Sequence, residues 1–403
     1  MKSATEKTQT ERVQRVYIGI DYHKKYSIYA VVDEAGECVA RGRIDHRRPE
    51  DFKALVKGWP EVRVVFEATS NWHWLFEVLE EAIGRDRLRM ANPFKTRVIA
   101  EAQVKTDKVD AAILAQLLRA DLICAVHIPA KETRQRKEVL RQRCFFVRQR
   151  TRVRNRIHRL ISGQHGLELP QLSDLFGVQG MSFLRKLQLP APDGTLLQQQ
   201  VALLGELQVR ITEDEKLLKQ MHCEHPLLGH ILSLPGMGPI LGTVVINEID
   251  DISRFPSAQK FCGYAGLCPT TSSSGGKTYN GKLFKHCNKW LRWAFIEAAW
   301  IAIRVDGSLG ALYQRKRAVG KRPSLAIVCV ARRLARITWQ LLTQKRDFAT
   351  NPPAQKNQGQ PARTGAPAPA AGSAKGGGSI GRTAKNGSVP RPRQLSPAAP
   401  LNA

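Results

Sequence analysis

The sequence predicts an α/β domain at the N-terminal end, followed by a basic helical arm and a mainly α-helical block, in a chain of 403 residues. Three observations lead to this fold class. Runs rich in β-formers alternate with amphipathic segments up to about residue 125. A basic stretch, 131–160, then contains no Gly or Pro, and two apolar segments of helical length, 288–304 and 323–342, come after it. This length allows two or three domains, each with a core of its own.

The strands of the first domain are predicted from short apolar runs. Residues 16–32 form two strands around a polar turn, because apolar residues flank Asp21 and the second arm is rich in Ile, Tyr and Val. Residues 62–68 form another strand that carries Glu67 at its C-terminal end, and 87–92 form a short one.

Helices are predicted between and after these strands. One begins near Ser70 or Asn71, either of which is a suitable N-cap. Another spans 93–120, where a stripe of apolar residues recurs at helical spacing: Ile99, Ala102, Val109, Ile113 and Leu117. Because strands alternate with helices, we predict an α/β domain over residues 15–125.

A basic helical arm is predicted over residues 126–225. Twelve Lys and Arg residues between 131 and 162 stand against only two acids. A second helix, about 195–221, places apolar residues seven apart: Leu197, Leu204, Ile211 and Leu218. This spacing is typical of a helical hairpin or coiled coil. The arginines indicate a nucleic-acid face, with Arg148, Arg152 and Arg156 as candidate contacts; the alternative is a solvated helix surface.

The block over residues 226–346 is predicted to be mainly helical and to open with a glycine-rich turn, "LPGMGPILG", at 234–242. It resembles a helix-hairpin-helix turn, in which Gly236 and Gly238 let the backbone approach a phosphate and the next helix aims its amides at the anion. An ordinary turn between helices is the alternative. Residues 347–403 are predicted to be a disordered basic tail, since from 350 onward they carry no acid and little that could form a core.

The overall charge indicates a polyanionic partner. Lys and Arg number 63 against 35 acids, the formal net charge is +28 and the pI is about 10.2. Nucleic acid is the usual partner of such a chain, and a ribosomal or membrane-surface protein is the alternative. The N-terminus lacks the apolar core of a signal peptide, and no apolar run approaches the roughly 20 residues of a membrane span. We therefore expect no membrane partner and a cytoplasmic, nucleoid-associated location.

The eight cysteines are scattered and lack CxxC spacing, which is typical of reduced thiols. Cys262, Cys268, His286 and Cys287 are poorly spaced for a metal site.

Four carboxylates form the candidate catalytic centre: Asp21, Glu67, Asp107 and Asp110. The first two end strands, and the C-terminal ends of the strands of an α/β sheet converge on one edge. The last two lie three apart on a helix, so they share one face and repel each other unless a cation lies between them. Mg²⁺ prefers such oxygens, and two ions can support phosphoryl transfer. The sequence therefore predicts a Mg²⁺ site.

The motifs of the chain resemble those of a known family. "IGIDYHK", "VFEATSNWHW" and "KTDKVDAAILAQLL" are similar to the N-terminal domain of the DEDD transposases of bacterial insertion sequences, family 110/1111. "LPGMGPILG" and "FCGYAGLCPTTSSSGGKTYNGKLFKHCNKWLRWAF" resemble the family's transposase-specific second domain. The resemblance covers residues 15–345. It implies an N-terminal domain like the RuvC resolvase, with the RNase H fold, that carries the DEDD carboxylates.

The same resemblance assigns a nucleophile. On composition, 270–282 is a flexible polar loop that serves as a linker or binds phosphate through Lys277. In the family, a serine just before a glycine in this motif attacks DNA, and Ser274 matches it; Ser272 and Ser273 leave the register open. The resemblance also implies composite sites shared within a homo-oligomer, a dimer or tetramer, and a bridge RNA that selects DNA by base pairing.

The sequence thus leads to one main hypothesis and two alternatives. The main one is a Mg²⁺-dependent transposase or recombinase that exchanges DNA strands through a transient phosphoserine. The first alternative is a Holliday-junction-type nuclease that uses the carboxylates and water without the serine. The second is a non-catalytic nucleic-acid-binding regulator with a degenerate nuclease fold.

Overall fold

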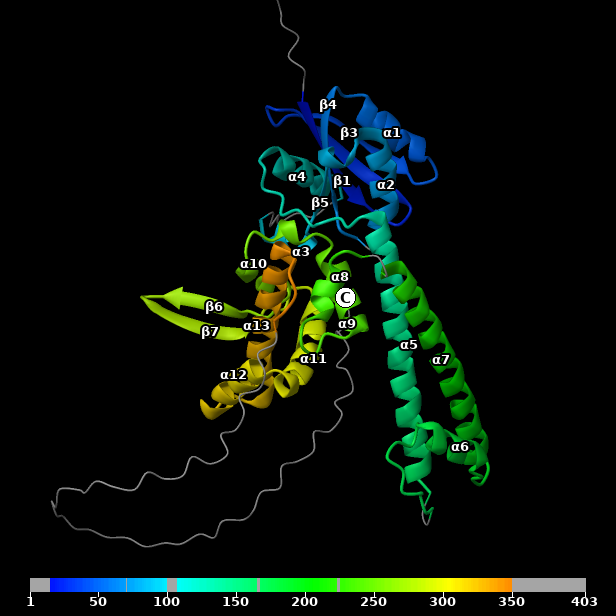
Figure 1. The fold of residues 1–403 in the computed structure, drawn as a ribbon. Coiled ribbons are helices and arrows are strands. Elements are labelled where there is room, and N and C mark those ends of the chain that lie inside the picture. Colours follow the sequence, from blue (N-terminus) through cyan, green and yellow to red (C-terminus); the bar gives the residue numbers. More distant parts are fainter. Residues whose placement is uncertain (1–14, 70, 100–106, 165–166, 223–224, 350–403) are drawn as a thin grey trace, which may run out of the picture. The chain divides into compact units, whose positions relative to one another are not determined.

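A computed structural model describes residues 15–69, 71–99, 107–164, 167–222 and 225–349 (Figure 1). The chain divides into two compact units, Met1–Pro129 and Ala130–Ala403, which we treat separately. The predicted four-part division, with boundaries after residues 125, 225 and 346, is finer than this and stays a prediction. The predicted tail from 350 onward, Ser70 as a cap and the middle of the predicted helix 93–120 lie outside the described residues.

The first unit is built on a five-stranded sheet. Its strands are β1 (Arg15–Tyr22), β2 (Tyr26–Val32), β3 (Cys38–Asp45), β4 (Glu61–Glu67) and β5 (Leu88–Ala91). Their order across the sheet is β3-β2-β1-β4-β5. Strand β2 runs antiparallel to both of its neighbours, while β1, β4 and β5 run parallel. This mixed sheet confirms the predicted α/β class.

Helices cover both faces of this sheet. The helical elements described in this unit are α1 (Pro49–Lys57), α2 (Trp72–Ile83), the short 3₁₀ turn η1 (Arg85–Arg87), α3 (Pro93–Ile99) and α4 (Asp107–Arg119). On one face, Phe52 of α1 and Phe76 of α2 pack into a core with Ile18 and Phe66 of the central strands. On the other face, residues of α4 pack with β1, β4 and β5 in a smaller core: Tyr17, Val65, Ala91, Leu114 and Leu118.

The arm in the second unit consists of two long helices, α5 (Lys131–Ser162) and α7 (Asp193–His222), with the short α6 (Val178–Lys186) between them in sequence. Figure 1 shows α5 and α7 side by side and α6 near one end of the pair. The four residues predicted at sevenfold spacing on α7 are all buried: Leu197, Leu204, Ile211 and Leu218. Both long helices match the predicted ranges closely, while coiled-coil geometry stays a prediction.

The rest of the second unit is mainly helical, as predicted. Its elements are α8 (Leu228–Leu232), α9 (Pro239–Ile249), η2 (Ile252–Arg254), α10 (Ala258–Tyr264), β6 (Pro269–Ser274), β7 (Lys277–Leu283), α11 (Lys289–Val305), α12 (Gly307–Ala318) and α13 (Pro323–Gln344). Residues Phe261, Phe295 and Leu334 are fully buried in their shared core. Over the described ranges, no helix combines the length and apolar character needed to cross a bilayer.

The prediction of a flexible loop over 270–282 was wrong. These residues form the antiparallel hairpin β6–β7, which Figure 1 shows extending away from α11 and α13. The run carries Thr and Ser before Gly275-Gly276 and Thr and Tyr after it, and a two-residue Gly-Gly turn is a strong hairpin signal. The hairpin was missed because almost all of its residues are polar and exposed, so the strands show no alternation of apolar and polar residues.

Among the other elements that were not predicted, three have weak sequence signals. Strand β3 lies at the sheet edge and is mostly exposed, so it lacks the apolar run of a buried strand. Helix α1 is short and begins at Pro49, which occupies the first helical position. Helix α6 buries only Gly180 and Leu184, which is too few for a recognisable stripe.

Candidate active site and nucleic-acid interface

Asp21 and Glu67 lie at the C-terminal ends of two neighbouring parallel strands. In the register of β1 and β4, Ile20 is opposite Phe66. Asp21 directly follows Ile20, and Glu67 directly follows Phe66. Side chains alternate between the two faces of a strand. Since Ile20 and Phe66 belong to the core under α1 and α2, both carboxylates are on the other face, the one that α4 covers.

Helix α4 is fixed against β1 at Gly19. A Cβ added to Gly19 would collide with the carbonyl oxygen of Ala111 and would lie 2.6 Å from the backbone nitrogen of Ala115. The helix then runs back along the strand, because its later residue Leu118 belongs to the core that contains Tyr17. The start of α4 is therefore at the C-terminal end of β1.

This packing brings Asp110 to the edge of the sheet that carries Asp21 and Glu67. Asp110 directly precedes Ala111, the residue in contact with Gly19, and is partly buried. Asp107 is the first residue of α4, and its side chain lies outside the described part of the chain. Among the side chains that are described, no three His, Cys, Asp or Glu residues gather closely enough to hold a metal ion. The edge thus carries Asp21, Glu67 and Asp110, which form no closed ligand set among the side chains that the structure describes.

Asp21 has a polar neighbour, and the residue after it belongs to an aromatic cluster. Its Oδ2 atom lies 3.2 Å from Nε2 of His23, and its side chain is 19% exposed. The next residue, Tyr22, stacks on His46 with ring centroids 4.7 Å apart. Burial lowers the pKa of His46, whose Nε2 atom lies 2.9 Å from the hydroxyl of Ser27. Tyr22 packs against the core under α1 and α2, so these rings lie on the opposite face of the sheet from Asp21.

Ser274 is the last residue of β6, at the tip of the hairpin. It pairs with Lys277 across Gly275 and Gly276, whose φ angles are +57° and +74°. Both angles fall in the left-handed region, where glycine carries no steric penalty. The hydroxyl of Ser273 lies 3.0 Å from that of Thr278 on the opposite strand. The turn therefore presents Ser274 and Lys277 together at an exposed tip.

The two glycines of the α8–α9 turn have different surroundings. Gly236 has a φ of +79°, and an added Cβ would collide with the carbonyl oxygen of Ala298 and approach Cβ of Ile301 to 3.0 Å. Its missing side chain therefore allows close packing on α11. Gly238 is exposed, caps the start of α9, and would carry a Cβ into open space. Gly238 alone offers a bare backbone to a ligand.

The basic residues of α5 fall into two groups. Some have partners inside the protein: Arg143 binds Glu215 of α7 at 2.6 Å, and Arg150 donates to Gln208 at 2.8 Å. Others are exposed, among them Arg152 and Arg156. Of the three predicted contacts, Arg148 is half-buried and lies over the ring of Trp290, 5.8 Å from its centroid. The exposed arginines fit either a nucleic-acid face or a solvated helix surface, whereas Arg143 and Arg150 have partners within the protein.

Two cysteines of the second unit, Cys262 and Cys287, are poor candidates for chemistry. Burial raises the pKa of Cys262 to about 12, and burial also raises the pKa of Cys287. High pKa values keep these thiols protonated and unreactive at neutral pH.

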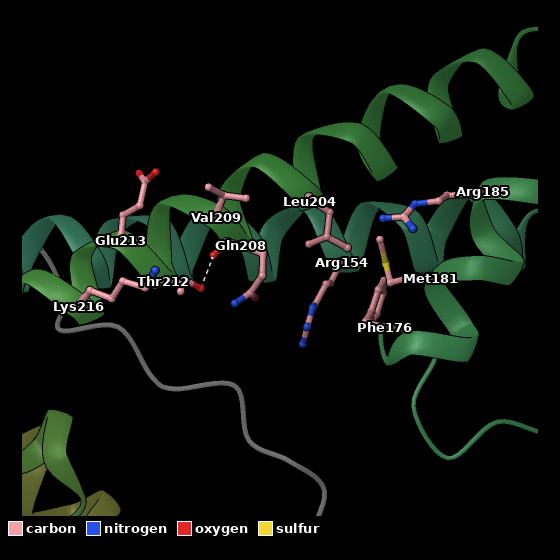
Figure 2. A pocket seen from close by; sticks show the side chains of 11 residues that line it. Arg154, Phe176, Met181, Arg185, Leu204, Gln208, Val209, Thr212, Glu213 and Lys216 are labelled. Atoms are coloured by element: carbon pink, nitrogen blue, oxygen red, sulfur yellow. Dashed lines mark hydrogen bonds between the residues drawn. The ribbon is translucent and has the colours of Figure 1, made fainter.

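A groove of about 480 Å³ lies on the arm, between α5, α6 and α7 (Figure 2). Leu204, Val209 and Met181 line it together with the cationic side chains of Arg154 and Arg185. It contains none of the predicted site residues.

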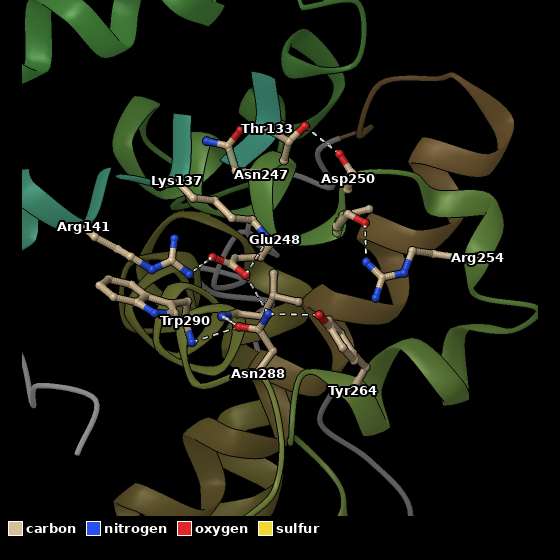
Figure 3. Close-up of polar contacts among 12 residues, drawn as sticks. Thr133, Lys137, Arg141, Asn247, Glu248, Asp250, Arg254, Tyr264, Asn288 and Trp290 are labelled. Carbon is tan, nitrogen blue, oxygen red and sulfur yellow. Dashed lines mark hydrogen bonds and ion pairs between the residues drawn. The ribbon is translucent and has the colours of Figure 1, made fainter. Parts of the chain in front are cut away.

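A buried polar cluster was not singled out from the sequence. Glu248 of α9 accepts hydrogen bonds from Asn288 at 2.8 Å and from Arg141 at 3.1 Å (Figure 3). The signal available in the sequence was an acid inside the largely apolar segment "PILGTVVINEI". A charged residue in such a helix is almost never fully buried unless it has partners.

Two sequence models of transposase families match the chain. Residues 18–165 match a DEDD transposase model of the IS110 type, described as a transposase. Residues 229–314 match a model described as the transposase IS116/IS110/IS902 family. The first match contains the carboxylates of the sheet edge, and the second contains the glycine turn and the serine hairpin.

Curated proteins of insertion elements are similar over most of the chain. An uncharacterized 44.8 kDa protein of insertion element IS116 from Streptomyces clavuligerus is 25% identical over 85% of this chain and 98% of its own length. The transposase for insertion sequence element IS1328 from Yersinia enterocolitica is 24% identical over 82% of this chain and 98% of its own. An IS900 protein from Mycobacterium paratuberculosis is 34% identical over 37% of each chain. The chain belongs to the IS110/IS116 family of insertion-sequence transposases.

Proposed function

We propose that this transposase cuts and rejoins DNA with a Mg²⁺ centre held by Asp21, Glu67, Asp107 and Asp110 and with Ser274 as the nucleophile. The observation that carries the proposal is the contact of α4 with Gly19, which brings the start of α4 to the strand ends that bear Asp21 and Glu67. An RNase H-like identity for the domain is part of the proposal, supported by the strand order β3-β2-β1-β4-β5 with β2 antiparallel to its neighbours.

Both the type and the position of these carboxylate residues are suitable for binding a hard divalent cation. Carboxylate oxygens are preferred ligands of Mg²⁺, and several carboxylates at one edge would repel each other without a cation. When bound, Mg²⁺ would polarise the scissile phosphate and stabilise the charge on the leaving oxygen. Because such a site retains coordination positions for phosphate, a DNA strand completes it.

Ser274 supplies the covalent step. Its Oγ atom attacks the phosphorus, the serine proton passes to a base, and the bond to one deoxyribose oxygen breaks as a phosphoserine ester forms. A hydroxyl of a second DNA strand then attacks the same phosphorus, and the serine oxygen leaves. Since one ester replaces another in each step, rejoining needs no ATP. The exposed tip formed by Ser274 and Lys277 supports this role, because a phosphate can reach both residues.

The carboxylates and the serine belong to different compact units. We propose that a composite site forms in a homo-oligomer, a dimer or tetramer, in which one protomer supplies Ser274 to the carboxylates of another. A bridge RNA that pairs with donor and target DNA is part of the same proposal. The exposed Arg152 and Arg156, together with Gly238 at the start of α9, would bind phosphates of either nucleic acid without reading sequence.

Trapping the covalent intermediate tests the proposal. The full-length protein, Mg²⁺, RNA transcribed from the flank of the element and DNA carrying the element ends are mixed, and protein–DNA adducts are separated under denaturing conditions. We expect Ser274→Ala to reduce adduct formation by at least roughly 10³-fold, as expected for loss of a nucleophile. Ser273→Ala is the matched control and retains the adduct.

The alternatives give different results in the same assay. If Ser274→Ala still cuts DNA while Asp21→Asn does not, water is the nucleophile and the protein is a nuclease. An adduct mapped to a peptide that lacks Ser274 would refute the serine assignment. Full strand exchange by a protein with both Asp107→Asn and Asp110→Asn would refute the metal site.

A further inference from the structure

The carboxylate of Glu248 is the centre of a buried polar cluster in the second unit. The residue is 3% exposed and lies on α9. Its Oε2 atom accepts from Nδ2 of Asn288 at 2.8 Å and lies 3.3 Å from Nζ of Lys137. Its Oε1 atom accepts from Nη2 of Arg141 at 3.1 Å (Figure 3). One carboxylate therefore joins α9 to the basic helix α5 and to Asn288.

Asn288 lies where the serine hairpin joins the core. Strand β7 ends at Leu283, and Asn288 caps α11, accepting from the backbone N–H groups of Trp290 at 3.1 Å and Leu291 at 3.0 Å. Its own backbone N–H donates to the carbonyl of Tyr264 at 2.9 Å. The side chain of Asn288 thus uses its oxygen to start α11 and its nitrogen to bind Glu248.

Helix α5 contacts the same junction through a ring. The guanidinium of Arg141 lies over Trp290 at 5.3 Å from the ring centroid, and that of Arg148 lies over it at 5.8 Å. Trp290 is in the first turn of α11. The base of the arm therefore touches the junction both through the carboxylate and through this aromatic ring.

A buried carboxylate in this position has to be kept with its partners. An ionised group out of water is costly unless cations and hydrogen bonds compensate it, and removing one partner leaves an uncompensated charge. Lys137 and Arg141, whose side chains are 13% and 34% exposed, supply that compensation. These three partners come from α5 and from the hairpin junction, so the carboxylate links the two.

We propose that Glu248 is a positioning residue that fixes the root of the Ser274 hairpin against the base of the arm. This inference rests on the proposed function, in which the hairpin delivers the nucleophile. A nucleophile must be held in a near-attack geometry, and small misplacements cost large factors in rate. Glu248 acts through Asn288 and does not touch DNA.

The test compares two carboxylate variants in the full-length protein. Glu248→Gln keeps the shape and loses the charge that binds Lys137 and Arg141. We expect the rate of adduct formation at saturating DNA to fall roughly 10- to 100-fold, while the affinity for DNA changes less than about threefold. Amide hydrogen exchange over 284–291 should become faster. The matched control is Glu215→Gln, which also removes a carboxylate paired with an arginine of α5, but one without a contact to the hairpin junction.

A second variant keeps the test informative if Glu248→Gln is unstable. In Glu248→Gln the single amide oxygen can accept from Asn288 or from Arg141, but not from both. In Glu248→Gln/Asn288→Asp the Gln amide nitrogen donates to the new carboxylate, which also caps helices well, and the Gln oxygen stays available to Arg141. We expect this double variant to recover slow exchange over 284–291 and at least part of the adduct rate.

Three results would overturn the inference. The first is unchanged amide exchange over 284–291 in Glu248→Gln. The second is an equal acceleration of that exchange in Glu215→Gln. The third is a loss of DNA affinity in Glu248→Gln that is proportional to its loss of adduct rate. The hydrogen-exchange measurement does not depend on the reaction with DNA, so its result remains valid even if Ser274→Ala shows that the serine is not the nucleophile. The two proposals can therefore fail independently.

Discussion

At the scale of single residues, alternation along one strand decides where the catalytic candidates lie. Asp21 was predicted from its position at the end of an apolar run, and its face follows from Ile20, which is buried on the opposite side. Gly19 is equally important for the position of the candidate site, although no sequence pattern indicated its role. Its missing side chain lets the backbone of α4 approach β1. The sequence could supply the carboxylates but not the residue that brings them together.

A substitution at Gly19 tests this packing. We expect Gly19→Ala to lower the free energy of unfolding of the N-terminal unit by roughly 1–3 kcal/mol, because the new methyl group overpacks the backbone of α4. Urea denaturation followed by circular dichroism measures the change. The same variant should lose Mg²⁺-dependent DNA cleavage, since α4 carries Asp107 and Asp110.

Gly58→Ala is the control for that experiment. An added Cβ at Gly58 meets the carbonyl oxygen of Ala54 at an ordinary 3.5 Å, and its φ of −67° suits any residue. Its free energy of unfolding should change by less than about 0.5 kcal/mol. Equal stability of Gly19→Ala and Gly58→Ala would contradict the packing argument.

At the scale of elements, the same residue type has different roles at neighbouring positions. In the turn before α9, Gly236 is required by its backbone angle and by the closeness of α11, whereas Gly238 faces open space. The sequence motif alone assigned both glycines to phosphate binding. The contacts of Gly236 are those of a packing residue, which leaves Gly238 as the candidate for a backbone contact with nucleic acid.

Substitutions at these two glycines should affect different properties, the stability of the second unit at Gly236 and DNA binding at Gly238. Gly236→Ala should destabilise the second unit, because the left-handed backbone angle costs about 1–2 kcal/mol for an L-residue and the collision with Ala298 adds to it. Gly238→Ala should cost less than about 1 kcal/mol, the range of a helix cap. It should weaken DNA binding by up to roughly tenfold, which corresponds to about 1.4 kcal/mol.

Thermal unfolding and a fluorescence-anisotropy titration with duplex DNA measure the two effects. A Gly238→Ala protein with unchanged affinity would remove the turn from the nucleic-acid interface. A Gly236→Ala protein as stable as the parent would show that α11 yields to the new side chain.

At the scale of the whole molecule, the excess of positive charge sets the strength of nucleic-acid binding. The formal net charge is +28, yet part of the basic helix α5 is satisfied internally, as in the pair of Arg143 with Glu215. Only cations that can reach phosphate displace counterions on binding. Exposed arginines of α5, such as Arg152 and Arg156, should therefore contribute to the salt dependence, unlike the internally paired Arg143.

Changing Arg152 and Arg156 together to Gln tests this distinction between exposed and internally paired arginines. Each lost phosphate contact should reduce the slope of log K against log salt concentration by about 0.9 on duplex DNA. We expect the loss to be the same for unrelated DNA sequences, because phosphate contacts carry no sequence information. Arg143→Gln is the control and should leave the slope unchanged. A slope that responds to Arg143 and not to Arg152 and Arg156 would refute the assignment.

The sequence by itself determined the α/β class of the N-terminal domain, the long helices of the arm and the helical character of the C-terminal block. These depend on local patterns: apolar alternation, sevenfold leucine spacing and the positions of Gly and Pro. It also supplied Asp21, Glu67 and Ser274 as chemically meaningful residues, through strand ends and family motifs. It failed for β3, α1 and the hairpin at 270–282, where exposed polar residues leave no apolar pattern to follow.

Only the tertiary structure decided which of these residues lie together. The contact of α4 with Gly19, the different surroundings of Gly236 and Gly238, and the cluster around Glu248 all join segments far apart in sequence. Such contacts depend on steric fit and on the cost of burying charge, and neither is written in the spacing of residues along the chain.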